Sequence, residues 1–142
     1  MISKSIFALA MIVAMLLVGC MAAGRSVVDS NVLAVPDQTQ IFGDWSGDSI
    51  CQVKDSPCHD EKVVYHISKG NGQDMLVVDA DKIVNGRADN MGKLDFKYDA
   101  QAQTMISEAH GHWVFNIKGN KMDGTLTTAD GTLFRKITLT KN

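Results

Sequence analysis

From residue 41 onward, apolar and polar residues alternate with a period of two, and no stretch has the 3.6-residue period of an amphipathic helix. The clearest case is residues 93–98, KLDFKY, in which the charged side chains share one face and the large apolar side chains share the other. Such alternation is typical of antiparallel strands with one buried face and one wet face. We therefore expect an all-β domain.

Clusters of Gly, Asn and Asp divide this region into about eight strand-like runs. Residues 118–121 and 129–132 indicate tight hairpin turns, because Gly and Asp-Gly accept positive φ. Residues 69–72 and 85–90 indicate looser connections. The runs are residues 41–52, 61–68, 73–83, 91–99, 103–109, 111–118, 121–128 and 131–140.

This order of elements predicts a single eight-stranded antiparallel up-and-down β-barrel, because closure removes the exposed strand edges. A two-sheet sandwich is the alternative. The chain has 142 residues, of which 45% are hydrophobic, enough for one domain with one core. Its net charge of −2 argues against a nucleic-acid partner, which needs a basic face.

Residues 1–19 have the pattern of a secretory signal peptide. Lys4 supplies the positive start, and residues 6–18 are apolar but too few to span a membrane as a helix. The segment ends Leu17-Val18-Gly19-Cys20, which resembles the bacterial lipobox, whose Cys becomes the lipidated first residue of the mature chain. Ordinary cleavage a few residues later is the alternative.

The chain after the leader divides into two parts. Residues 20–39 show no sustained period and contain Gly24 and Pro36, so we interpret them as the lipidated Cys20 and a flexible tether. Residues 40–142 form the barrel domain. Met21 follows Cys20, and by resemblance to enteric lipoproteins this implies the outer membrane, facing the periplasm. The membrane, reached through the lipid anchor, is thus one expected partner.

The sequence has three Cys, an odd number that needs an explanation in a secreted chain. If Cys20 carries lipid, Cys51 and Cys58 remain as a pair, and we expect a disulfide suited to an oxidising compartment. The alternative is a metal site with Cys-x6-Cys spacing beside His59, but it lacks a second pair of ligands at the spacing of zinc fingers.

Phe42-Gly43-Asp44-Trp45 opens the first predicted strand. It resembles the Gly-x-Trp start of the calycins, which include the lipocalins, the fatty-acid-binding proteins and the avidin-like barrels. That resemblance implies an Arg near the end of the last strand that packs across the Trp ring and helps to close the barrel. Arg135 is the matching position, and it shares the inward face of its strand with Leu133 and Ile137.

Longer segments resemble a group of small secreted bacterial proteins of uncharacterised activity. These segments are residues 45–51, 56–65 and 80–86. This second resemblance implies a fold and no activity.

Neither a metal site nor catalysis is predicted. His110 and His112 would place two imidazoles on one side of a strand. Trp113 and Phe115 have the opposite parity and are expected to face the interior, so both His should face solvent. Glu108 shares their parity, yet no third ligand has an obvious spacing. No nucleophile elbow or similar catalytic motif occurs, so we expect no enzyme and no cofactor.

The barrel interior is the candidate binding site. An eight-stranded barrel is just wide enough either to be filled by side chains or to hold one small ligand. The number of large rings favours a filled or nearly filled interior, and in a hollow one Arg135 would meet a ligand carboxylate. Two functions follow: binding of a small apolar ligand, or, as the alternative, a protein-binding module such as an inhibitor or envelope factor that acts through loops. The residues that point inward by parity are Tyr65, Phe96, Tyr98, Trp113, Phe115 and Arg135.

Overall fold

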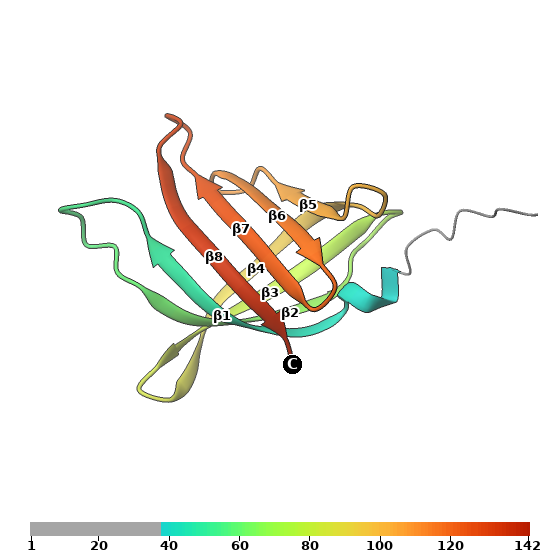
Figure 1. Cartoon of the computed structure of the whole chain (residues 1–142), viewed down its shortest axis with the longest axis horizontal. Coiled ribbons are helices and arrows are strands. Elements are labelled where there is room, and N and C mark those ends of the chain that lie inside the picture. Colours follow the sequence, from blue (N-terminus) through green and yellow to red (C-terminus); the bar gives the residue numbers. More distant parts are fainter. Residues whose placement is uncertain (1–37) are drawn as a thin grey trace, which may run out of the picture. The chain divides into compact units, whose positions relative to one another are not determined.

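The structure, a computed structural model, describes residues 38–142. The predicted signal peptide, Cys20 and nearly all of the predicted tether lie outside the described residues. The described part forms a closed antiparallel barrel in which each strand pairs with the next and the last pairs with the first (Figure 1). The elements are η1 (Gln38–Ile41), β1 (Gly43–Cys51), β2 (Glu61–Lys69), β3 (Met75–Val84), β4 (Arg87–Asp99), β5 (Thr104–Ser107), β6 (His112–Lys118), β7 (Lys121–Thr127) and β8 (Leu133–Lys141).

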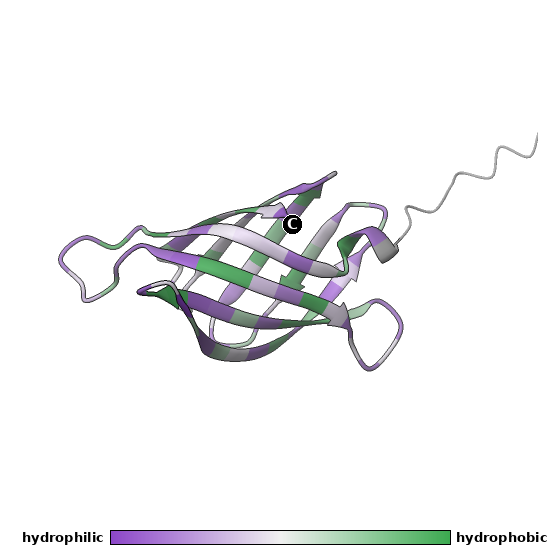
Figure 2. Ribbon diagram, turned by 90° about the horizontal axis from the view of Figure 1, so that it is seen from below, coloured by the Kyte–Doolittle hydropathy of each residue, from purple (hydrophilic) through white to green (hydrophobic). Residues whose placement is uncertain are grey.

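This architecture confirms the predicted eight-stranded up-and-down barrel and shows that the sandwich alternative is wrong. Along the strands, hydrophobic and hydrophilic residues alternate as expected (Figure 2). The fold is compatible with the calycin resemblance.

The two ends of the barrel differ, and we name them for what covers them. At the capped end, β1 begins, β8 ends and the short helix η1 packs on the core, with Ile41 only 2% exposed. The indole Nε1 of Trp45 donates a hydrogen bond of 2.8 Å to the carbonyl oxygen of Ile41, which fixes η1 in place. The open end carries the connections formed by residues 52–60, 85–86, 108–111 and 128–132, several of which project to the left in Figure 1.

The capped half of the interior is filled by side chains. Large side chains from different strands meet there without solvent exposure, among them Trp45, Met105, Met122 and Leu139, each 0% exposed. The ring of Phe115 also fits only because Gly124 faces it: a Cβ on Gly124 would lie 2.2 Å from that ring. The expectation of a filled interior therefore holds for this half of the barrel.

The connection between β3 and β4 is tighter than predicted. Residues 85–90 were expected to form a loose connection, but β3 and β4 pair as far as Val84 and Arg87, leaving only Asn85-Gly86 between them. Both turn residues have positive φ, 51° and 75°, which is the geometry that Asn-Gly favours in a two-residue hairpin turn. The resulting hairpin projects beyond the barrel (Figure 1).

Candidate functional site

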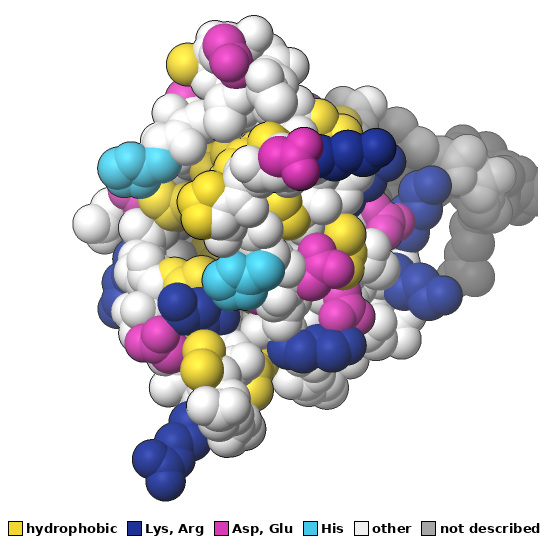
Figure 3. Space-filling view, turned by 90° about the vertical axis from the view of Figure 1, so that its left-hand side faces the viewer, with side chains coloured by type: hydrophobic (Ala, Val, Ile, Leu, Met, Phe, Trp, Pro, Cys, Tyr) yellow, Lys and Arg dark blue, Asp and Glu magenta, His cyan; other side chains and the backbone are white. Residues whose placement is uncertain are grey.

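The open half of the barrel contains a pocket of about 440 Å³. This volume lies within the usual range for sites that hold small molecules. Figure 3 faces the open end and shows apolar side chains gathered in its middle, with charged and His side chains around them. The pocket is lined by Tyr65, Val78, Ala80, Met91, Gly92, Lys93, Leu94, Phe96, His110 and Trp113.

Packed aromatic rings form one wall of the pocket. Phe115, which is 0% exposed, lies behind the lining residues and contacts three of them. The ring of Trp113 stacks on it with centroids 6.3 Å apart, and Tyr65 and Phe96 meet it edge to face at 6.1 and 5.8 Å. The Nε1 of Trp113 also donates a hydrogen bond of 3.0 Å to the carbonyl oxygen of Ala109. Because these rings hold one another in place, the wall is formed before any ligand arrives.

The pocket exists because small residues meet on neighbouring strands. Ala80 of β3 pairs directly with Gly92 of β4, so two adjacent inward positions have almost no side chain. Immediately beyond this pair the register shifts, and Met91 becomes the extra residue of a β-bulge. Bulges re-aim side chains, and Met91 lies 44% exposed at the rim of the pocket.

The side chain of Asn90 holds the bulge in place with hydrogen bonds. Its amide nitrogen donates hydrogen bonds of 2.8 Å to one carboxylate oxygen each of Asp79 and Asp81. Its side-chain oxygen accepts a bond of 3.0 Å from the backbone N–H of Gly92. The bond from Asn90 is the main reason that the pKa of Asp79 is lowered from its ordinary value. Asp79 and Asp81 therefore hold the bulge from outside the barrel.

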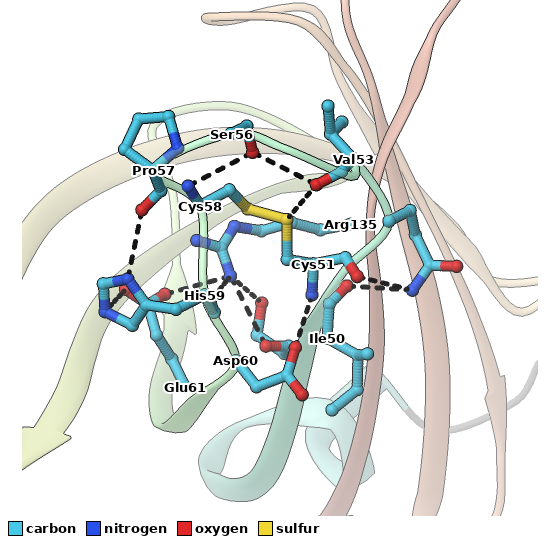
Figure 4. Close-up of a disulfide and its surroundings, with 12 residues drawn as sticks. Ile50, Cys51, Val53, Ser56, Pro57, Cys58, His59, Asp60, Glu61 and Arg135 are labelled. Carbon is cyan, nitrogen blue, oxygen red and sulfur yellow. Dashed lines mark hydrogen bonds and ion pairs between the residues drawn. A yellow bond between two sulfur atoms is a disulfide. The ribbon is translucent and has the colours of Figure 1, made fainter.

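A charged cluster occupies the β1, β2 and β8 side of the open end. Nη1 of Arg135 lies 3.1 Å from Oε2 of Glu61, and both side chains are only 14% exposed. The same nitrogen donates hydrogen bonds to Oγ of Ser49 at 3.1 Å and to the carbonyl oxygen of His59 at 3.3 Å. Figure 4 shows the guanidinium pointing toward His59, at the end of the loop, and Glu61, the first residue of β2. The inward parity of Arg135 is thus explained by an ion pair.

The predicted stacking of Arg135 on Trp45 is wrong. The β1–β8 register pairs Arg135 with Cys51 but Trp45 with Lys141. At about 3.3 Å per residue, the two positions on β8 are about 20 Å apart. Instead, Nζ of Lys141 lies 5.8 Å from the centroid of the Trp45 ring and donates a hydrogen bond to the carbonyl oxygen of Gln40. Lys141 supplies the cation that the resemblance assigned to Arg135, although all of these residues lie along the seam where the barrel closes.

Tyr65 belongs to both the pocket and the neighbourhood of the charged cluster. Burial raises its pKa to about 12, while nearby Arg135 lowers it and Glu61 raises it to smaller extents. The hydroxyl therefore stays neutral at physiological pH. Since Tyr65 also lines the pocket, it contributes an uncharged side chain to that lining.

The Cys51–Cys58 disulfide is confirmed, with the two Cα atoms 5.9 Å apart, and the alternative metal site at these residues is wrong. Hydrogen bonds order the loop that it closes (Figure 4). The backbone N–H of Cys51 donates to Oδ1 of Asp60 at 2.9 Å, and Oγ of Ser56 donates to the carbonyl oxygen of Val53 at 3.1 Å. Because Glu61 directly follows this loop, the disulfide helps to position the carboxylate that binds Arg135.

The histidines do not form a shared site. His110 lies in the turn before β6 with φ of 58°; it is exposed, as expected, and it also lines the pocket. His112 is exposed, as expected, and its Nδ1 lies 2.7 Å from Oε1 of Glu108. His66, on the outer face, lies 2.7 Å from Asp44 and 3.2 Å from Asp81. Within residues 38–142, no group of three or more His, Cys, Asp or Glu side chains is placed to hold a metal ion.

The structure separates the predicted interior residues into three groups. Tyr65, Phe96 and Trp113 line the pocket, and Phe115 supports them from behind. Tyr98 lies outside the lining and accepts a hydrogen bond of 3.0 Å from Gln103. Arg135 does not line the pocket and is already paired. Sequence reasoning missed Ala80, although its inward parity was visible, and it missed Met91 and Gly92 because a bulge depends on pairing.

No protein-family model and no curated protein matches the sequence. In the described part of the chain, no helix is long and apolar enough to cross a membrane.

Proposed function

We propose that the barrel binds one small, mostly apolar molecule in the pocket at its open end. The observation that carries this proposal is the pocket of about 440 Å³ behind a preformed aromatic wall. An eight-stranded barrel needs no such space for its stability, because its interior can be filled completely by side chains. The alternative, a protein-binding module that acts through the loops of a filled barrel, is not the one that this pocket favours.

A neutral fluorescent ligand tests this proposal. N-phenyl-1-naphthylamine becomes bright when it leaves water, so its binding to the full-length protein can be titrated directly. Ala80→Phe places a ring in the pocket, and we expect the dissociation constant to rise about tenfold or more, as for a loss of 1.4 kcal/mol. The matched control is Ala88→Phe on the same hairpin, where Ala88 is exposed and does not line the pocket.

Circular dichroism should show that both variants keep the barrel. Equal affinities for the wild type and Ala80→Phe, or no binding by the wild type, would contradict binding in this pocket.

We also propose that the chain is a calycin-like lipoprotein of the bacterial envelope, anchored at Cys20 and sorted to the outer membrane. The support is the Leu17-Val18-Gly19-Cys20 motif and a disulfide that suits an oxidising compartment. Each acyl chain contributes about 0.8 kcal/mol per buried methylene, and two or more chains anchor a protein stably.

Labelled palmitate tests the anchor. The full-length chain expressed in a bacterium should take up the label and fractionate with the outer membrane, and Cys20→Ala should do neither. Met21→Ala, the neighbouring control, should still be labelled. Label on Cys20→Ala would refute lipidation at this residue, whatever the pocket binds.

A further inference from the structure

The wall of the barrel is interrupted beside the pocket. β4 pairs with β3 from Arg87 to Lys97, but it pairs with β5 only from Lys97 to Asp99. The reason is the length of β5, which ends at Ser107 after four residues. Among the described residues, no strand pairs with the other edge of β4 along residues 87–96.

The turn between β5 and β6 packs on β7 and leaves this edge uncovered. His110 and Gly111 both have positive φ, 58° and 125°, which turns the chain sharply into β6. A Cβ on Gly111 would lie 2.7 Å from Cδ1 of Leu126 and 2.9 Å from the carbonyl oxygen of Thr127. Glycine therefore lets the turn pack closely on the end of β7.

The residues that line the pocket come from both sides of this interruption. Residues 91–94 belong to the uncovered stretch of β4, and His110 and Trp113 belong to the turn and to the start of β6. The pocket therefore reaches the barrel wall where the wall lacks a strand, as well as lying toward the open end.

The titratable groups that line the pocket include no carboxylate. Tyr65, Lys93 and His110 are the titratable residues of the lining, and no carboxylate is among them. Nζ of Lys93 is exposed and lies 3.3 Å from Oδ2 of Asp79, which is not part of the lining. The carboxylate of Glu108, on the nearby turn, is paired with His112. The rim thus offers the ammonium group of Lys93, which is shared with Asp79 on the outer face, and the imidazole of His110, with the apolar wall behind them.

We propose that the pocket opens sideways between β4 and the β5–β6 turn, and that it takes a small amphipathic acid. The apolar body of the ligand packs on Trp113 and Phe96. Its anionic group stays at the opening, where Lys93 and His110 bind it. This inference rests on the proposed function, to which it adds the class of ligand and its route of entry.

Two fluorescent compounds with the same rings test the ligand class. N-phenyl-1-naphthylamine is neutral, and 8-anilinonaphthalene-1-sulfonate adds one anionic group. We expect the full-length protein to bind the anion more tightly, and Lys93→Met with His110→Asn to reduce that preference about two- to fivefold, as for exposed charge pairs. Asn is chosen at position 110 because it tolerates positive φ. The control Lys118→Met, at the capped end, should leave the preference unchanged.

The route of entry is tested at the bulge. Met91→Trp should weaken binding of both compounds by obstructing the opening, whereas Val84→Trp, at an equally exposed position outside the lining, should not. Unchanged binding of both compounds by Met91→Trp would overturn the sideways opening. Binding of the neutral compound without any preference for the anion would overturn the ligand class but leave the proposed function standing. Binding of neither compound would refute the proposed function itself.

Discussion

The capped and open halves of one barrel are built by the same strands, yet one is solid and the other hollow. In the capped half, large side chains such as Trp45 and Met122 meet without exposure, and η1 closes the end. In the open half, Ala80 and Gly92 stand side by side on β3 and β4, and the space they leave becomes the pocket. The hollow comes from the small size of two paired residues, and it lies beside the stretch of β4 that has no partner strand on its other edge.

The largest expected loss of stability follows from removing Trp45, and it should exceed the loss from removing Trp113. Trp45→Ala should reduce the free energy of unfolding by about 3–5 kcal/mol, because it leaves a cavity in a filled core. Trp113→Ala should cost about half of that or less, because its ring already borders empty space. Urea denaturation followed by circular dichroism measures both. Equal losses would mean that the two halves are packed alike.

Removing the disulfide should weaken the open end by a smaller amount. Cys51→Ala with Cys58→Ala should lower the free energy of unfolding by about 2.5 kcal/mol, the chain-entropy value for so short a loop. Chemical denaturation of the double variant without reductant measures the loss. In the wild type, alkylation of Cys51 or Cys58 without reductant would contradict the disulfide.

The ion pair of the charged cluster should show energetic coupling between Arg135 and Glu61, and no coupling with Trp45 at the capped end. Arg135→Met should cost about 1–3 kcal/mol, because it leaves the carboxylate of Glu61 without its partner. Glu61→Gln with Arg135→Met should cost less than the sum of the single changes, since the two side chains are in contact. Lys136→Met, at the next and exposed position on β8, is the control and should be nearly neutral. The effects of Arg135→Met and Trp45→Ala should add, because these residues lie at different ends.

The smallest expected effect concerns His66 on the outer wall. Its pKa is raised from the ordinary value, first by the hydrogen bond to Asp44 and also by Asp81. The protonated ring therefore stabilises the folded protein fully below a pH of about 6.5, the unfolded value, and this contribution is lost as the pH rises through the folded pKa. His66→Gln should reduce stability more at acidic than at alkaline pH, with a difference below about 1 kcal/mol. Urea midpoints measured across that range test the sign.

The strands were predictable from the sequence because alternation marks them locally, and the lining residues Tyr65, Phe96 and Trp113 followed from their parity. The Asn85-Gly86 turn carried its own signal, but the polar residues after it show no alternation and were interpreted as a loop. The bulge at Met91 and the early end of β5 depend on pairing between strands. They cannot be predicted from the local sequence of one segment. The exchange of roles between Arg135 and Lys141 is of the same kind, because only the β1–β8 register decides which cation meets Trp45.

The uncovered edge of β4 has a consequence for self-association. A free edge offers backbone donors and acceptors to any other strand, including the same edge of a second molecule, and so favours aggregation. Here the uncovered stretch of β4 carries the charged residues Arg87, Asp89, Lys93 and Asp95, and the bulge at Met91 interrupts its regular pleat. Charges and bulges of this kind are how natural sheets prevent edge-to-edge stacking. The same short stretch of chain thus keeps the barrel wall open while protecting the protein from polymerising through the opening.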